Sequence, residues 1–124
     1  GANDIACGAG RVVIMVTHEP KRFADKVSYI SSPGFLDGGN ARERYGFVGG
    51  GPSAIITTLG ILRPDPLTKE FYLDAYYAFS SVEEILTNTG WDLKVSPNVR
   101  VVPEPSPEEL AALRKVDETG ALRK

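Results

Sequence analysis

The sequence has few of the residues that stabilise secreted or membrane proteins. Its single cysteine, Cys7, cannot form a disulfide within the chain, so a reducing, cytoplasmic compartment is expected. A small buried apolar side chain is the favoured interpretation of Cys7 over a nucleophile. No apolar run approaches the roughly 20 residues of a membrane-spanning helix, and no signal peptide is evident.

An excess of charge of one sign is also lacking. The 124 residues carry 14 basic and 16 acidic side chains, a net charge of −2, and 42% of them are hydrophobic. No basic block or aromatic–basic stripe indicates a nucleic-acid-binding protein. A phosphate-binding loop, a dinucleotide fingerprint and zinc-ligand spacing are all absent. The composition therefore predicts a globular domain with a core, with neither a metal nor a bound cofactor.

Glycine, by contrast, is concentrated in one loop that ends at a β-branched strand. The loop closes with Gly49, Gly50, Gly51, Pro52 and Ser53. Three glycines allow close approach by a ligand or a second chain segment, whereas the proline restricts φ. A rigid loop at the mouth of a buried strand is a usual place for a small-molecule site. A tight connector is the alternative interpretation.

Hydrophobic patterning predicts one α/β domain over residues 1–117, followed by a flexible tail at 118–124. A continuous apolar run predicts a strand at 11–17, buried on both faces of a parallel sheet. Further strands are predicted at 26–31, 53–62, 70–79 and 99–102. The short proline-rich turn between the third and fourth makes them an antiparallel hairpin. Residues 32–53 form a loop long enough to suggest function.

Two helix starts are marked by capping boxes. Ser81 with Glu84 begins one helix, and Ser106 with Glu109 begins another that has a proline at its first position. Gly90 is predicted to end the first of these helices in a left-handed conformation.

Few side chains point to catalysis. His18, the single histidine, follows the first predicted strand, at the sheet edge where α/β proteins place catalytic groups. No nucleophile is near it in sequence, so a loop histidine is favoured. Asn3 and Asp4 predict the cap of a helix over residues 5–8. Alternatively, the local amides hold an oxyanion or an acyl group.

Motifs along nearly the whole chain resemble the β-type subunits of family I coenzyme A transferases. Residues 1–6, read with the strand at 11–14, resemble the family's glycine-alanine-asparagine-aspartate segment. Residues 32–34, 49–58 and 89–93 resemble the glutaconate CoA-transferase branch. The resemblance implies the layered α/β fold of the family, with a mostly parallel sheet and a hairpin. It also implies that the chain is a partial domain, the C-terminal portion of a β-type chain.

The resemblance further implies covalent catalysis by a glutamate in a Ser-Glu-Asn-Gly motif, through a glutamyl-CoA thioester. None of the nine glutamates here lies in such a motif. The nucleophile is therefore expected upstream, in the N-terminal part of the same subunit, and coenzyme A is a substrate. The family's oxyanion or acyl pocket maps onto Gly1, Ala2 and Asn3, and a substrate loop onto residues 49–53. An α-type subunit is the expected partner.

Three further expectations follow from this resemblance. The chain begins within a family motif, so we expect it to come from a longer protein, with an exposed sheet edge that a partner or a missing segment covers. A ring-opening hydrolase on CoA esters, lacking the glutamate, is the alternative in the same family. A non-catalytic sensor of sugar phosphates is the alternative of another class, although the scattered arginines give no phosphate-binding cluster.

Overall fold

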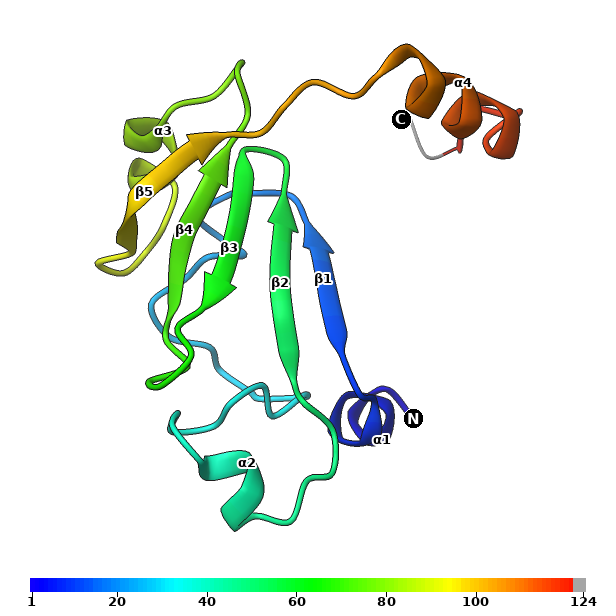
Figure 1. The fold of residues 1–124 in the computed structure, drawn as a ribbon. Coiled ribbons are helices and arrows are strands. Elements are labelled where there is room, and N and C mark those ends of the chain that lie inside the picture. The colour runs from blue at the N-terminus through cyan, green and yellow to red at the C-terminus, as the bar shows by residue number, and fades with distance from the viewer. Residues whose placement is uncertain (122–124) are drawn as a thin grey trace.

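Five strands form one mixed sheet whose spatial order is the order of the chain (Figure 1). A computed structural model describes residues 1–121. The strands are β1 (Val12–Val16), β2 (Pro52–Thr57), β3 (Gly60–Pro64), β4 (Phe71–Tyr76) and β5 (Lys94–Val101). The helices are α1 (Ala2–Gly8), α2 (Ala41–Arg44), α3 (Val82–Thr87) and α4 (Pro107–Val116).

Parallel and antiparallel pairings are evenly divided. β1 pairs with β2 and β4 with β5 in parallel, whereas β2–β3 and β3–β4 are antiparallel. Short turns join the antiparallel strands, whereas the long connections at 17–51 and 77–93 join the parallel ones. Parallel strands need such long connections because the chain must return to the same end of the sheet before the next strand begins. The α/β class and the predicted hairpin of β3 and β4 are confirmed. The sheet is less parallel than predicted because a second hairpin was missed.

That second hairpin divides the strand predicted at 53–62. The chain turns at residues 58–59, where the Thr57 hydroxyl accepts hydrogen bonds from the N–H groups of Leu59 (3.1 Å) and Gly60 (2.9 Å). A threonine hydroxyl that satisfies the next backbone amides ends a strand. The β-branched run continues across this turn, so hydrophobic pattern alone reads the two strands as one.

The prediction of a strand at residues 26–31 is wrong. These residues lie in the long connection after β1, outside the sheet, and Val27, Tyr29 and Ile30 are exposed. The alternating pattern gives this segment strand propensity, but pairing within the sheet is absent. The predicted burial of β1 on both faces is also wrong, because β1 is an edge strand on which Val13 is 46% and Met15 79% exposed.

The core lies on the sheet face that α3 and the segment after β1 cover. It consists of Phe23, Leu62, Leu73, Ile85 and Leu93, and Trp91 packs against it. Burial of each such side chain contributes about 1.5–3 kcal/mol to stability.

The prediction that Gly90 adopts a left-handed conformation is wrong, since Gly90 is not among the glycines with positive φ. Glycine is needed there because a Cβ would lie 2.7 Å from the carbonyl oxygen of Phe23.

The helix starts follow the sequence closely. Ser106 and Glu109 form the predicted reciprocal capping box. The Ser81 hydroxyl accepts a hydrogen bond from the N–H of Glu84 (3.1 Å), which is one half of the other predicted box. The predicted Asn3–Asp4 cap is wrong: α1 begins at Ala2 with Gly1 as its N-cap, without a side-chain cap.

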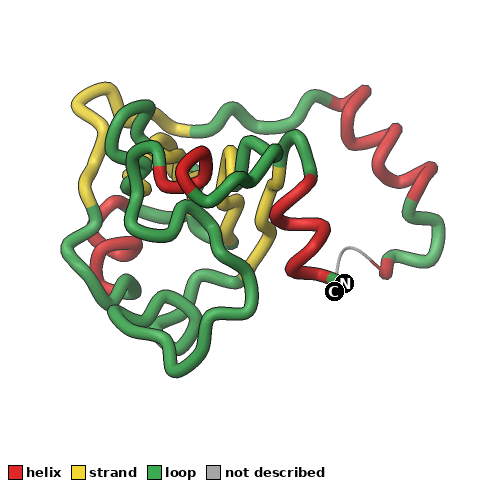
Figure 2. Tube along the Cα trace, turned by 90° about the horizontal axis from the view of Figure 1, so that it is seen from below, coloured by secondary structure: helices red, strands yellow, loops and turns green. Residues whose placement is uncertain are grey.

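Helix α4 stands apart from the sheet. An extended stretch at residues 102–106 carries it away from β5 (Figures 1 and 2). None of its ten residues is buried. The predicted tail lies only partly within the structure: residues 118–121 follow α4 in a turn, and 122–124 lie outside the described residues. Among residues 1–121, no helix is both long and apolar enough to cross a membrane.

Candidate functional site

The glycine loop, residues 49–53, lies in backbone contact with the end of α1. The N–H of Gly49 donates to the carbonyl of Cys7, and the N–H of Gly50 donates to the carbonyl of Gly10, each at 3.2 Å. A Cβ on Gly49 would overlap the Ala9 carbonyl oxygen, and one on Gly50 would lie 2.7 Å from that of Gly10. Glycine is therefore required here by close backbone packing. Both amides are already used within the chain, which supports the connector interpretation for this part of the loop.

A buried arginine holds the loop against the helix. Arg42 of α2 is only 7% exposed. Its Nε donates to the carbonyl of Gly49 (3.0 Å), and its Nη1 donates to that of Gly34 (2.7 Å). Its Nη2 donates to the carbonyls of Cys7 (3.0 Å) and Ala6 (3.3 Å). The last two lie in the final turn of α1, where the helix dipole favours a positive charge.

Aromatic rings complete the packing around this arginine. The guanidinium carbon lies 5.1 Å from the centroid of the Phe47 ring, a cation–π distance. Gly51 has φ +77°, and a Cβ there would lie 2.9 Å from Phe35 and 3.0 Å from the Arg42 side chain. Gly51 thus needs its glycine for both conformation and space.

Both predicted site segments contact or form part of α1, but they lie at its opposite ends. Gly1, Ala2 and Asn3 are exposed at its first turn, whereas Gly49 contacts its last turn. Seven helical residues separate the ends by about 10 Å. In the segment 49–53, Pro52 is buried, and the Ser53 hydroxyl donates a hydrogen bond to the carbonyl of Val12 (3.2 Å).

Both segments lie at the amino ends of the parallel strands β1 and β2 (Figure 1). Open α/β sheets place ligand sites beyond the carboxyl ends of their strands. The topological argument for the glycine loop as a ligand site therefore does not apply to this sheet, and any role in binding has to come from the local chemistry.

His18 lies at the carboxyl end of β1 and is part of the core packing. It is 6% exposed, and its ring stacks on Phe23 at a centroid distance of 4.0 Å. Its Nδ1 lies 3.1 Å from the hydroxyl of Thr57, and its Nε2 lies 3.0 Å from that of Thr89. Burial lowers the pKa of His18, an effect that the charge of Glu84 opposes. His18 thus lies in a loop, as predicted, but its ring is buried and both ring nitrogens lie within hydrogen-bond distance of threonine hydroxyls.

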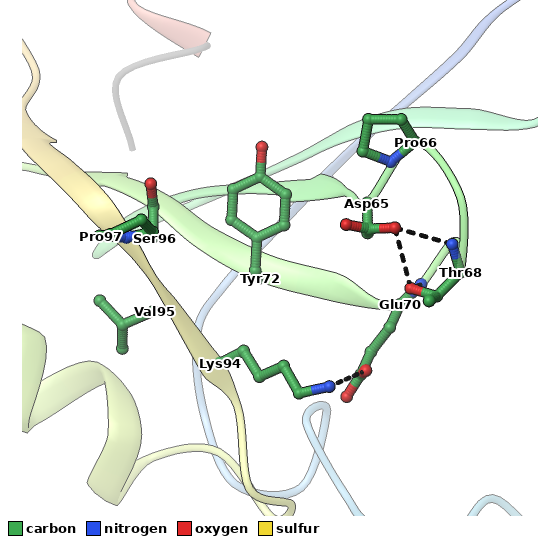
Figure 3. Close-up of a pocket in the computed structure, with 9 residues that line it drawn as sticks. All are labelled: Asp65, Pro66, Thr68, Glu70, Tyr72, Lys94, Val95, Ser96 and Pro97. Atoms are coloured by element: carbon green, nitrogen blue, oxygen red, sulfur yellow. Dashed lines mark hydrogen bonds and ion pairs between the residues drawn. The ribbon is translucent and has the colours of Figure 1, made fainter.

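Two pockets are lined by both basic and acidic side chains. The larger of these two, about 370 Å³, lies between the β3–β4 turn and the start of β5 (Figure 3). There Lys94 pairs with Glu70 at 2.5 Å, and Asp65 accepts hydrogen bonds from the N–H groups of Leu67 and Thr68. Its charges are thus satisfied locally. The smaller, about 280 Å³, lies beside the glycine loop and is lined by Arg42, Lys69, Asn40, Glu43, Phe35 and Phe47, among others.

Among residues 1–121, none of the glutamates is buried, and Asp117 is the one buried carboxylate. The pKa of Glu19 is lowered by hydrogen bonding to Arg22, and that of Glu108 by backbone and Ser106 hydrogen bonds. Both are surface interactions. Within residues 1–121, no three histidine, cysteine or acidic side chains gather in a way that would hold a metal ion.

Arg42 and Lys69 were not identified from the sequence. Arg42 is one of several arginines, and its burial depends on carbonyl groups from three separate segments. Lys69 joins it only because the β3–β4 turn folds against residues 38–39, where the N–H of Gly39 donates to the carbonyl of Thr68 (3.0 Å). The one available signal is an arginine inside a glycine-rich loop.

Comparison with known proteins identifies relatives over most of the chain. The coenzyme A transferase family model matches residues 1–88. The B subunit of glutaconate CoA-transferase from Acidaminococcus fermentans is 47% identical over 86% of this chain and 40% of its own length. The B subunit of 3-oxoadipate CoA-transferase from Pseudomonas knackmussii is 35% identical over 94% of this chain and 45% of its own. The chain thus spans less than half the length of these relatives.

Solved structures agree on the fold. The crystal structure of glutaconate coenzyme A-transferase from A. fermentans superposes with a TM-score of 0.88 at 40% identity, over all of this chain and 48% of that one. IpdAB of Rhodococcus jostii RHA1 superposes at 0.73 and 21% identity, over 91% of this chain and 45% of that one. At this identity the second likeness concerns the fold alone.

Proposed function

Because this chain belongs to the coenzyme A transferase family, we propose that it forms part of an enzyme that moves coenzyme A between an acyl-CoA and a carboxylic acid. The observation that carries the proposal is the 47% identity to a CoA-transferase B subunit over most of the chain. The second curated relative is also a CoA-transferase B subunit. Both favour transfer over the ring-opening hydrolase and the sensor.

The reaction we propose needs groups from outside this chain. By the family's mechanism, CoA passes from the acyl-CoA to a glutamate carboxylate. The acyl–CoA thioester bond is broken, a glutamyl–CoA thioester is formed, and the first acyl group leaves as its carboxylate. A second carboxylic acid then accepts CoA from the glutamyl thioester. We propose that this glutamate lies in the N-terminal part of the same subunit and that the active site is completed by an α-type subunit.

The exposed edge of the sheet supports this arrangement. Within residues 1–121, β1 leaves one side of its backbone unpaired, and Val13, Ile14 and Met15 along it are all more than a third exposed. Proteins seldom leave an apolar edge strand open, because it pairs with other chains. We propose that the N-terminal part of the subunit covers this edge, with residues 1–117 as its C-terminal partner domain.

We retain Gly1, Ala2 and Asn3 as the proposed oxyanion or acyl contact. The first N–H groups of α1 have no carbonyl partner within the helix, and the segment is exposed. Residues 49–53 remain the second candidate. Since the amides of Gly49 and Gly50 are engaged with α1 and Gly10, we expect this loop to act by shaping the site rather than by donating these amides.

The decisive experiment measures CoA exchange in the complete complex. Exchange that is lost when the upstream glutamate is replaced by glutamine supports the covalent route, and exchange that survives the replacement excludes it.

A second experiment tests the proposed oxyanion contact. Ala2→Pro removes one backbone donor at a helix position that tolerates proline. If that N–H serves the oxyanion, we expect kcat to fall about 100- to 1,000-fold. Ala2→Gly keeps the N–H and is the matched control.

A further inference from the structure

Two cations from distant parts of the sequence line the pocket of about 280 Å³ beside the glycine loop. Arg42 comes from α2 and Lys69 from the β3–β4 turn. Within residues 1–121 neither forms an ion pair with a carboxylate: every acceptor described for their charged groups is a backbone carbonyl. Lys94, in the pocket of Figure 3, is by contrast neutralised by Glu70.

The turn that carries Lys69 restricts its backbone and side chain. Its backbone adopts a left-handed conformation with φ +65°, which is uncommon outside glycine. Its Nζ donates to the carbonyl of Pro66 (2.7 Å) and lies 5.9 Å from the centroid of the Phe35 ring. Phe35 also packs beside Gly51, next to the Arg42 side chain. Phe35 thus lies near both Lys69 and the Arg42 side chain, and all three line the same pocket.

No carboxylate among residues 1–121 forms an ion pair with either cation, although Asp65 lies close enough to Lys69 to interact with its charge. Backbone carbonyls accept four hydrogen bonds from Arg42 but do not neutralise its positive charge, which water screens poorly in these buried surroundings. Glu43 lines the pocket, but its side chain is exposed. An anion of two or more oxygens would gain charge-assisted hydrogen bonds from Lys69 and favourable electrostatics from Arg42.

We propose that this pocket binds the phosphate group of an organic ligand, with Phe35 and Phe47 as apolar walls for the rest of that ligand. Two carriers share this chemistry: a nucleotide phosphate such as coenzyme A bears, and a sugar phosphate. Naming coenzyme A as the carrier rests on the proposed function, whereas the phosphate site itself does not. The fold thus assembles a basic pair that the scattered arginines of the sequence did not reveal.

The test titrates the 124-residue chain with adenosine 3′,5′-bisphosphate, with ribose 5-phosphate and with phosphate-free pantetheine, following backbone amides by NMR. We expect saturable shifts at Gly49, Gly50 and Lys69 with the bisphosphate and none with pantetheine. Lys69→Asn removes the charge but tolerates the left-handed backbone, and it should weaken binding at least about tenfold. Lys115→Met, on α4, makes the same change in net charge and should leave binding unchanged.

Equal weakening by both variants, or saturable shifts with pantetheine alone, would overturn the phosphate site. Stronger binding of ribose 5-phosphate would keep the site and assign it to a sugar phosphate. The result is separable from the proposed function. Phosphate binding without CoA exchange in the assembled complex leaves the site standing, and exchange without phosphate binding leaves only the transferase.

Discussion

At the scale of single residues, steric contacts explain why the glycine loop needs glycine: a Cβ there would overlap neighbouring backbone atoms. Gly49 faces the carbonyl oxygens of Ala9 and Cys7, whereas Gly8 has open space where a Cβ would stand. We expect Gly49→Ala to destabilise the protein by about 1–3 kcal/mol through overpacking. Gly8→Ala, within α1, should be neutral or stabilising by up to about 1 kcal/mol. Urea unfolding measures both, and equal effects of the two substitutions would contradict this explanation of the loop.

His18 makes stability depend on pH in a predictable direction. Burial lowers its pKa in the folded state, so the unfolded chain takes up the proton first as the pH falls. Stability is therefore full above the unfolded pKa of about 6.5 and decreases as the pH falls below it. As His18 is the only histidine, His18→Gln should flatten the dependence between about pH 7 and pH 5. Unfolding free energies at several pH values test this, and an unchanged slope would refute it.

At the scale of elements, how far the sequence predicts the fold depends on whether the determining contacts are local. The capping box at Ser106 and the β3–β4 hairpin are set by neighbouring residues, and both are confirmed. The segment at 26–31 has a strand's pattern, but whether it pairs depends on distant strands. Likewise, Arg42 and Lys69 form a pocket only through contacts between remote loops, which no spacing along the chain reveals.

Helix α4 is expected to be dispensable for the stability of the sheet. None of its ten residues is buried, and a helix of this length is marginal in water without packing. A chain ending at Val102 should unfold within about 0.5 kcal/mol of the full chain. Ile85→Ala, in the core, should by comparison cost about 2–5 kcal/mol. Chemical denaturation compares the two, and a loss of several kcal/mol on removing α4 would mean that it packs on the sheet in solution.

At the scale of the whole molecule, the chain spans less than half of its curated relatives, and we expect it to have no transferase activity alone. Transfer needs a carboxylate held close to the thioester carbon, and its effective molarity is lost when that group is absent. Within residues 1–121, none of the glutamates is buried as a nucleophile in a closed site would be. CoA exchange by the purified chain tests this, and turnover above background would contradict it.

The loop at residues 32–53 should respond to assembly. Alone, it is held mainly by Arg42 and by the backbone contacts of Gly49 and Gly50, while Leu36, Tyr45 and Val48 are 45–91% exposed. We infer that a partner covers these side chains, because monomeric proteins rarely expose large contiguous apolar patches. We therefore expect amide hydrogen exchange in this loop to slow when the proposed α-type subunit is added, with the amide of Leu73 in β4 as an internal reference for global stability. Equal protection of the loop with and without that subunit would show that the partner binds elsewhere.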